Sequence, residues 1–162
     1  MPTDKSMINK KTFDGEELQK LKDLLVSEDN YKIIAGIKNM NNLELHTFAA
    51  NYNWNSGFEV PKAILGNDNC DFGTGLLMFY RADGYRLLES KDALSESTLR
   101  ERKEFISNLY QRLLEDGFYN KEISFTPPLT KVQVFKLRKS NPSVPSILLD
   151  KSPGDEVEIP VL

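Results

Sequence analysis

The centre of the chain contains the sequence DFGTGLLMFYRADG, residues 71–84. Residues 76–80 are all apolar, so a helix formed here is apolar around most of its circumference. A helix of that kind is buried on several sides by neighbouring elements. Asp71 stands where an N-cap residue belongs, and Gly84 stands where a left-handed residue commonly follows a helix. We therefore predict a central, buried helix over residues 72–83.

Three shorter helices are predicted before the central one, and each follows a capping signal. The capping residues are Asp14 with Glu17, Ser27, and Asn41 with Glu44. Val26 and Tyr31 flank Ser27 in the arrangement of a hydrophobic staple. Because the joints between these helices are short, we expect neighbouring helices to pack antiparallel.

Two more helices complete the predicted bundle. Pro61 fits the first turn of a short helix, where its missing N–H costs nothing, and residues 66–69 end that helix. Residues 98–101, Thr-Leu-Arg-Glu, form a capping box, which predicts the longest helix over residues 99–116. The predicted fold is mainly α, a compact bundle of about six short helices over residues 13–118.

The ends of the chain differ from this bundle. Residues 1–12 are predicted to be an N-terminal tail, and residues 119–162 an extended C-terminal arm of short strands. Within the arm, residues 131–137 alternate between polar and apolar side chains as a strand does. Two further short apolar runs, residues 147–149 and 157–159, are separated from it by turns that contain Pro and Gly.

Length and composition exclude several classes of protein. The chain has 162 residues and a formal net charge of −3, so we expect one domain and no nucleic-acid partner. Its single cysteine, Cys70, excludes an internal disulfide and a zinc site made of several thiolates. No stretch approaches the ~18 apolar residues of a membrane span, and no leader is evident, so we expect a cytoplasmic protein without a membrane partner. No spaced ligand motif predicts a metal or another cofactor.

The net charge has one location in the sequence. Residues 41–80 contain four acidic side chains and only one basic one, Lys62, whereas the segments on either side are neutral. Half of the sixteen aromatic residues, including the only tryptophan, lie between Phe48 and Tyr85. Aromatic side chains ringed by polar groups are typical of protein–protein interfaces. This composition predicts a binding surface within residues 51–83.

The predicted binding residues combine aromatic, amide and acidic side chains. They are Tyr52, Trp54, Asn55, Glu59, Asp68, Asp71 and Asp83. An acidic surface of this kind favours a basic protein partner, because opposite charge steers association. A structural alternative remains open, in which Trp54 folds back over a helix joint and the asparagines satisfy turns.

An enzymatic alternative also remains open. His46 is the only histidine, so near-neutral acid–base chemistry requires this residue or a carboxylate with a shifted pKa. A small hydrolase or metal-dependent enzyme would use His46 with Asp71, Glu59 or Cys70, the thiol serving as nucleophile. Against this, a lone histidine on a helix is often only a hydrogen-bonding residue, and a lone cysteine before an apolar helix is often a small core residue.

Three pieces of sequence resemble a known bacterial family. They are Asn51 to Pro61 with its Tyr-Asn-Trp, Gly-Phe and Pro residues, Asn69 to Leu76 with Cys-Asp-Phe-Gly-Thr, and Phe79 to Gly84. Together, over about residues 43–90, they resemble the domain of unknown function 4274. The resemblance implies a small helical domain in bacteria and no established activity. Where that pattern often has Asp after Trp, this chain has Asn55.

The leading functional prediction is therefore a non-enzymatic domain that binds another protein, of a toxin-neutralising or regulatory type, through residues 51–83. The enzyme that uses His46 is the first alternative. A purely structural helical domain is the second. The sequence makes no prediction of oligomeric state.

Overall fold

A computed structural model describes residues 13–89 and 100–162. The described residues form eight α-helices and one short 3₁₀ helix: α2 Gly15–Leu25, α3 Asn30–Ile37, α4 Asn42–Asn51, α5 Glu59–Leu65, α6 Phe72–Arg81, α7 Tyr85–Glu89, α8 Arg100–Leu114, α9 Lys131–Ser140 and η2 Ser146–Leu148. The predicted mainly helical fold is confirmed. The predicted tail and the predicted cap at Thr98 lie outside the described residues.

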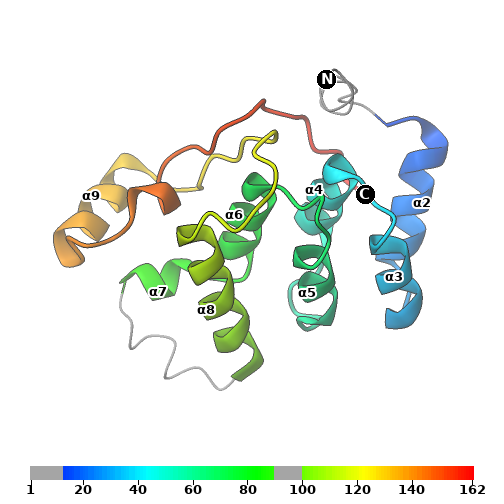
Figure 1. The fold of residues 1–162 in the computed structure, drawn as a ribbon, viewed down its shortest axis with the longest axis horizontal. Helices are drawn as coiled ribbons and strands as arrows, with labels where there is room; N and C mark the ends of the chain where they lie inside the picture. The colour runs from blue at the N-terminus through cyan, green and yellow to red at the C-terminus, as the bar shows by residue number, and fades with distance from the viewer. Residues whose placement is uncertain (1–12, 90–99) are drawn as a thin grey trace.

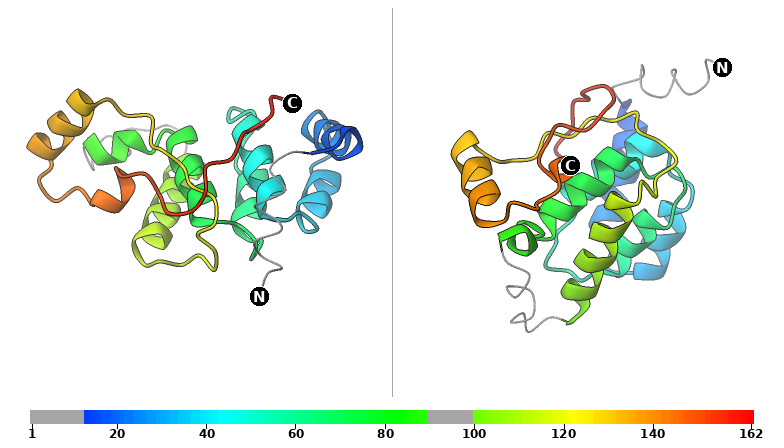
Figure 2. Two further views of the ribbon diagram at one scale, coloured as in Figure 1. Left: turned by 90° about the horizontal axis from the view of Figure 1, so that it is seen from above. Right: turned by 60° about the vertical axis from the view of Figure 1, so that its left-hand side comes forward.

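The helices are arranged as pairs in a row (Figure 1). Helices α2 and α3 form one pair, α4 and α5 the next, and α6 and α8 the third. Neighbouring pairs meet through α2 with α4, α4 with α6, and α3 with α5. Helix α9 packs on α7 and lies at the opposite end of the row from α2 and α3 (Figures 1 and 2).

Helix α6 is the buried centre of the molecule, as the sequence predicted. Its residues 72–79 are all buried, and Leu76, Met78 and Phe79 have no exposed surface. Phe72 packs edge-on against Phe118, which lies beyond the end of α8. The continuous apolar run therefore meets neighbours on every side.

Two predicted capping boxes are confirmed. Asp14 and Asn41 accept hydrogen bonds from the backbone N–H groups of Glu17 and Glu44, both at 2.8 Å. Each glutamate side chain in turn accepts from the backbone N–H of its cap. These caps begin α2 and α4, the first helices of their pairs.

The start of α3 differs from the prediction. Asp29, rather than Ser27, is its N-cap, and the Asp29 carboxylate accepts from the N–H groups of Tyr31 and Lys32. Ser27 instead accepts from the N–H of Asp29. The shift by two residues turns Val26 and Tyr31 outward, 76% and 89% exposed, so the predicted staple does not form.

The end of α6 also differs in detail. Asp83, and not Gly84, has the left-handed backbone, with φ of 72°. Gly84 is needed for space, because a Cβ there would lie 2.7 Å from the ring of Phe79. The following helix, α7, has no counterpart among the predicted elements.

The prediction of strands in the C-terminal arm is wrong. Residues 131–137 lie within α9, which begins with a capping box formed by Thr130 and Gln133. The apolar residues of this stretch lie on two sides of the helix: Val134 and Leu137 face the core, whereas Val132 and Phe135 face solvent. Apolar residues on both sides of a helix gave the appearance of a strand's alternation. Residues 147–149 belong to a 3₁₀ turn and its cap, and residues 157–159 have no regular structure. Within the described residues, the arm has only isolated bridges, Asp71 with Asn120 and Ile123 with Asp155.

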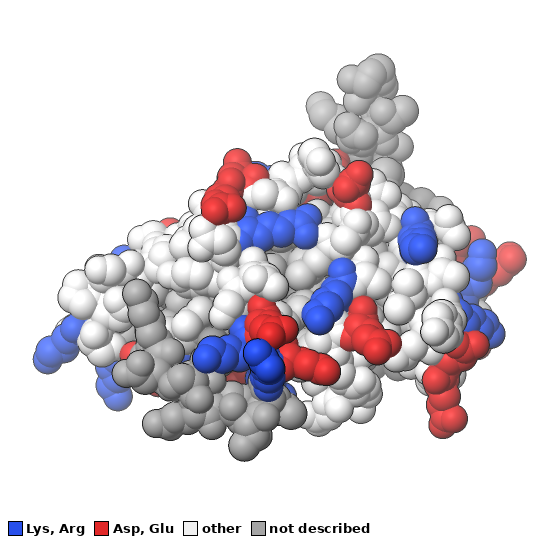
Figure 3. Space-filling view, turned by 60° about the horizontal axis from the view of Figure 1, so that its bottom comes forward, with Lys and Arg blue, Asp and Glu red and all other residues white. Residues whose placement is uncertain are grey.

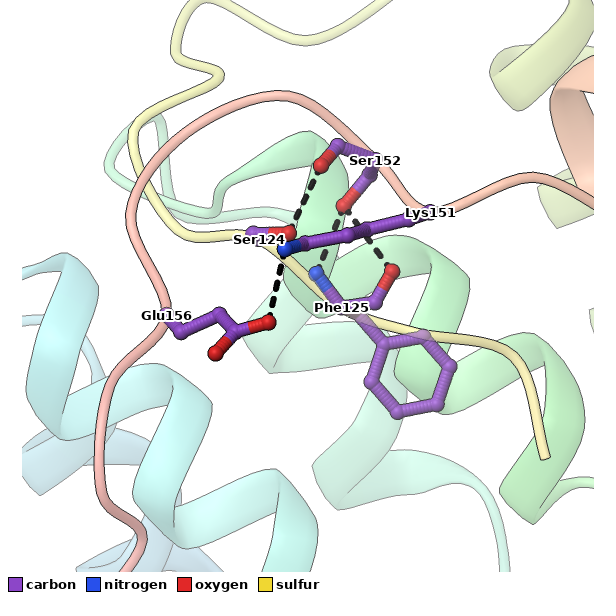
Figure 4. Close-up of polar contacts among 5 residues, drawn as sticks. All are labelled: Ser124, Phe125, Lys151, Ser152 and Glu156. Carbon is purple, nitrogen blue, oxygen red and sulfur yellow. Dashed lines mark hydrogen bonds and ion pairs between the residues drawn. The ribbon is translucent and has the colours of Figure 1, made fainter.

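The arm packs on its own helices. Figure 4 shows its two extended segments joined at Ser124, Phe125 and Ser152. The Phe125 N–H donates to the Ser152 hydroxyl and the Ser124 hydroxyl donates to the Ser152 carbonyl, both at 2.7 Å. Lys151 and Glu156 form an ion pair at 2.6 Å beside them. Further on, the Asn51 amide donates to the Pro160 carbonyl and accepts from the Leu162 N–H, which holds the final residues on α4.

The arm lies directly against α6 at Gly73. A Cβ at this position would lie 1.9 Å from the carbonyl oxygen of Ile123. Backbone atoms cannot move aside as the end of a side chain can. Glycine is therefore required here for packing.

We predict that Gly73→Ala lowers the free energy of unfolding by about 3 kcal/mol, because the added methyl group forces the arm away from α6. Gly15→Ala is the matched control, since Gly15 is also helical and a Cβ there would have no atom within 4 Å. We expect the control to be neutral or slightly stabilising. Urea unfolding followed by circular dichroism measures both variants, and equal stabilities would contradict the role assigned to Gly73.

Candidate functional site

Trp54 lies in an aromatic cluster at the joint between α4 and α5. Its ring centroid is 5.4 Å from that of Tyr52, 6.0 Å from Phe105 and 6.4 Å from Phe58. The indole N–H donates to the Ala49 carbonyl at 3.3 Å, and the side chain is only partly exposed. These contacts are those of the structural alternative, in which Trp54 folds back over the helix joint.

Tyr52 and Asn55 belong to the turn that the aromatic cluster covers. The Tyr52 hydroxyl donates to the Gly57 carbonyl at 2.8 Å, and Gly57 has a φ of 101°, which favours glycine. Partial burial, and then the charge of Glu59, raise the pKa of Tyr52. Asn55 is exposed, and its backbone N–H donates to the side chain of Asn53. The asparagine-rich sequence therefore satisfies a tight turn.

His46 and Cys70 are both about 1% exposed. The Nδ1 of His46 lies 2.9 Å from the Thr74 hydroxyl, so α4 and α6 share this polar contact within the core. Burial, with a contribution from Arg81, lowers the pKa of His46 to about 4, so the imidazole is neutral at pH 7. Burial raises the pKa of Cys70 to about 12. A protonated thiol and a shielded imidazole do not form an activated nucleophile.

Asp71 is fully buried and connects the arm to α6. Its Oδ2 accepts from the backbone N–H groups of Ile123 at 2.7 Å and Glu122 at 3.1 Å. The side chain makes no capping hydrogen bond, although Asp71 is the N-cap residue of α6 by position. Burial raises the pKa of Asp71 to about 6, and the charge of Glu122 adds to this, whereas the two backbone hydrogen bonds act in the opposite direction.

Asp83 has a structural position as well. It is half-buried at the end of α6, where its carboxylate lies 3.8 Å from the guanidinium of Arg86. Both side chains are about half exposed, so the pair contributes little to stability. Asp83 thus pairs with a neighbour in the chain rather than with another predicted binding residue.

Glu59 and Asp68 lie on a different surface, between α3 and α5. Two adjoining hollows of about 450 and 480 Å³ share Ile34 there, and we call them together the α3–α5 groove. The first hollow is lined by Glu28, Asp29, Asn30, Tyr31, Ile34 and Glu59. The second is lined by Ile34, Lys38, Ala63, Gly66, Asn67, Asp68 and Asn69. Of the seven predicted binding residues, only Glu59 and Asp68 line this groove.

Charge in the groove is predominantly negative. Four carboxylates line it, from Glu28, Asp29, Glu59 and Asp68, together with one cation, Lys38. Asn30 donates to Glu59 at 3.0 Å, which positions this carboxylate between the two helices. Figure 3 shows positive and negative side chains interspersed over a wider face of the molecule, with no broad patch of one sign. Within the groove, by contrast, carboxylates outnumber cations four to one.

Sequence reasoning missed Glu28, Asp29 and Tyr31. Two acidic residues directly before a helix are a usable signal, but a charge count by segments places them in a neutral flank. If Ser27 were the cap, Tyr31 would be buried in a hydrophobic staple with Val26. The cap at Asp29 instead exposes the tyrosine beside the two carboxylates.

Residues 40–114 match the model of a family described as a domain of unknown function, DUF4274. This segment is a DUF4274 domain. The domain extends from just before α4 to the end of α8 and contains the sequence pieces that resembled the family. Neither the curated proteins nor the solved structures gave a match to the chain.

The residues through which this chain resembles the family perform structural tasks. Pro61 and Phe58 are buried, as are Cys70 and Asp71 at the beginning of α6. Gly73 admits the backbone of the arm. In this chain these residues join α4, α5 and α6, while the residues Glu28 to Ile34 of the groove lie outside the matched segment.

Residues 13–89 and 100–162 offer neither a metal site nor a membrane span. No cluster of three or more histidine, cysteine, aspartate or glutamate side chains in these ranges could hold a metal ion. No helix in the same ranges is both long enough and apolar enough to cross a bilayer.

We predict that Cys70 in the native protein does not react with a thiol reagent such as DTNB at pH 8, and reacts fully in denaturant. Its burial and its raised pKa both prevent formation of an accessible thiolate. Absorbance of the released chromophore measures the reaction. Rapid labelling of the native protein would instead revive Cys70 as a nucleophile.

We predict that Asp71 makes stability depend on pH between about 4 and 6. The Asp71 carboxyl binds its proton more tightly in the folded than in the unfolded protein. The resulting contribution to the free energy of unfolding is complete below pH 3.8 and is lost as the pH rises through about 6. The ordinary and the folded pKa values, 3.8 and about 6, correspond to about 3 kcal/mol. Asp71→Asn retains an oxygen acceptor for the arm and removes the titration.

Urea unfolding of both proteins at several pH values tests this role of Asp71. As the pH falls from 7 to 4, the wild type should gain stability relative to Asp71→Asn. The other carboxylates titrate equally in both proteins, so their effect cancels in the difference between the two unfolding free energies. A difference that is constant with pH would contradict the assignment.

Proposed function

We propose that this chain is a non-enzymatic protein-binding domain, and that the α3–α5 groove receives a basic, partly apolar segment of its partner. The observation that carries the proposal is the lining of the groove by four carboxylates and one lysine around apolar surface. Opposite charge would steer the partner, and contact with Tyr31 and Ile34 would bury apolar area. A toxin-neutralising or regulatory role in the cytoplasm is compatible with binding of this kind.

The exposure of Tyr31 supports the choice of this surface. Tyr31 lies beside a hollow and is 89% exposed, so the free protein buries little of its ring. Tyrosine is enriched at the centres of interfaces because its ring buries a large area and its hydroxyl bonds at the edge. Ile34 at the junction of the two hollows provides a second apolar contact.

The proposed binding surface does not include Trp54. The aromatic cluster around Trp54 is satisfied within the chain, whereas Glu59 and Asp68 retain accessible carboxylates. The enzymatic alternative gains no support, because His46 and Cys70 are shielded from any substrate in this conformation. The residues that keep their chemistry at the surface are those of the groove.

Binding of a fluorescein-labelled helical peptide of repeating lysine and leucine tests the proposal. We expect the peptide to bind with an affinity that falls as salt is added, and the glutamate–leucine counterpart not to bind. Glu59→Lys should weaken binding by about tenfold, because it reverses a charge that lines the groove and is held in place by Asn30. Fluorescence anisotropy measures the affinities.

The control is Glu104→Lys, the same change on the exposed surface of α8. This variant should bind the peptide nearly as the wild type does. Equal weakening by both variants would indicate nonspecific attraction to the negative protein and would contradict the assignment to the groove.

A further inference from the structure

The chain itself contains a basic, partly apolar surface of the kind that the groove requires. Residues 126–149 contain Lys131, Lys136, Arg138 and Lys139 and no acidic residue at all. All four of these cations are exposed. All four cations lie on helix α9, so its exposed surface is positive where the α3–α5 groove is negative.

The apolar part of this surface lies on the same side of α9. Val132 and Phe135 are 62% and 58% exposed, and they are three residues apart, so they neighbour each other on the helix. Lys136 and Lys139 continue the same face at helical spacing. We call these four residues the α9 face. The opposite side of α9 is already used, because Leu137 is buried in the core.

The two complementary surfaces lie at opposite ends of the row of helices. Helix α9 is at one end in Figure 1, and α3 with its groove is near the other. Helices α4, α5, α6 and α8 lie between them, so one copy cannot bring its own α9 face into its own groove (Figures 1 and 2). A second copy can.

We propose that the α9 face of one copy docks in the α3–α5 groove of another, in a head-to-tail contact. This inference rests on the proposed function and names the partner as a second copy of this chain. Phe135 and Val132 enter the hollow beside Tyr31, and the lysines meet the groove carboxylates. The contact occupies the α9 face of one copy and the groove of the other, so the pair keeps one free groove and one free α9 face. The contact therefore propagates into chains or closes into a ring.

Two variants that each remove one side of the contact give a sharp test. Glu59→Lys damages the groove and leaves the α9 face intact, whereas Phe135→Asp damages the α9 face and leaves the groove intact. We expect the average mass of the wild type to rise with concentration at low salt beyond that of a dimer. Each variant alone should associate at least tenfold more weakly. Light scattering after size-exclusion chromatography measures the masses.

An equimolar mixture of the two variants should form 1:1 dimers and nothing larger. Only one pairing is then intact, the α9 face of the Glu59→Lys copy in the groove of the Phe135→Asp copy. Glu104→Lys and Tyr119→Asp are the controls, because both positions are exposed and lie outside the two surfaces. Both controls should assemble as the wild type does.

Three results would overturn the inference: a monomeric wild type at every concentration, variants that assemble normally, or a mixture that stays monomeric. The lysine–leucine peptide separates this inference from the proposed function. If the wild type is monomeric and the peptide still binds in the groove, the second copy is the wrong partner and the binding function stands. If the peptide does not bind either, both proposals fail.

Discussion

The burial of α6 is the constraint on which the rest of the structure depends. A helix that is apolar around most of its circumference must be covered on several sides, and helices α4 and α8 supply only part of that cover. The C-terminal arm supplies the remainder, and it approaches so closely that only glycine fits at position 73. The Asp71 carboxylate then satisfies two backbone N–H groups of the arm, which stay paired although they are buried.

This constraint explains why most residues that attracted functional interpretations have structural tasks. His46 pairs with Thr74 inside the core, and Trp54 closes the joint between α4 and α5. Aromatic, amide and carboxylate side chains are as useful for satisfying buried polar groups as for binding a partner, so composition does not separate the two uses. What remains available at the surface is the negatively charged groove between α3 and α5, whose α3 side lies outside the segment that matches the family.

The arrangement of helix pairs in a row also determines where binding surfaces can occur. Each pair contacts its neighbours, so the interior pairs are covered on two sides and the two ends of the row are not. The end formed by α2 and α3 exposes Tyr31, and the end formed by α9 exposes Phe135. The packing of the helices decides that the positive surface of α9 and the negative groove lie at opposite ends of the row.

The sequence by itself determined the helices that have local signals. The capping boxes at Asp14 and Asn41 and the apolar run of α6 predicted their elements, because each depends on neighbours within a few residues. Helix α9 was predicted as a strand, since Val132 to Leu137 fits both periods and only the core shows which side chains turn inward. The tertiary structure alone decided that Asp71 is buried against the arm and that Glu28 and Asp68 lie along one groove, because long-range packing brings together residues whose separation in the chain carries no such information.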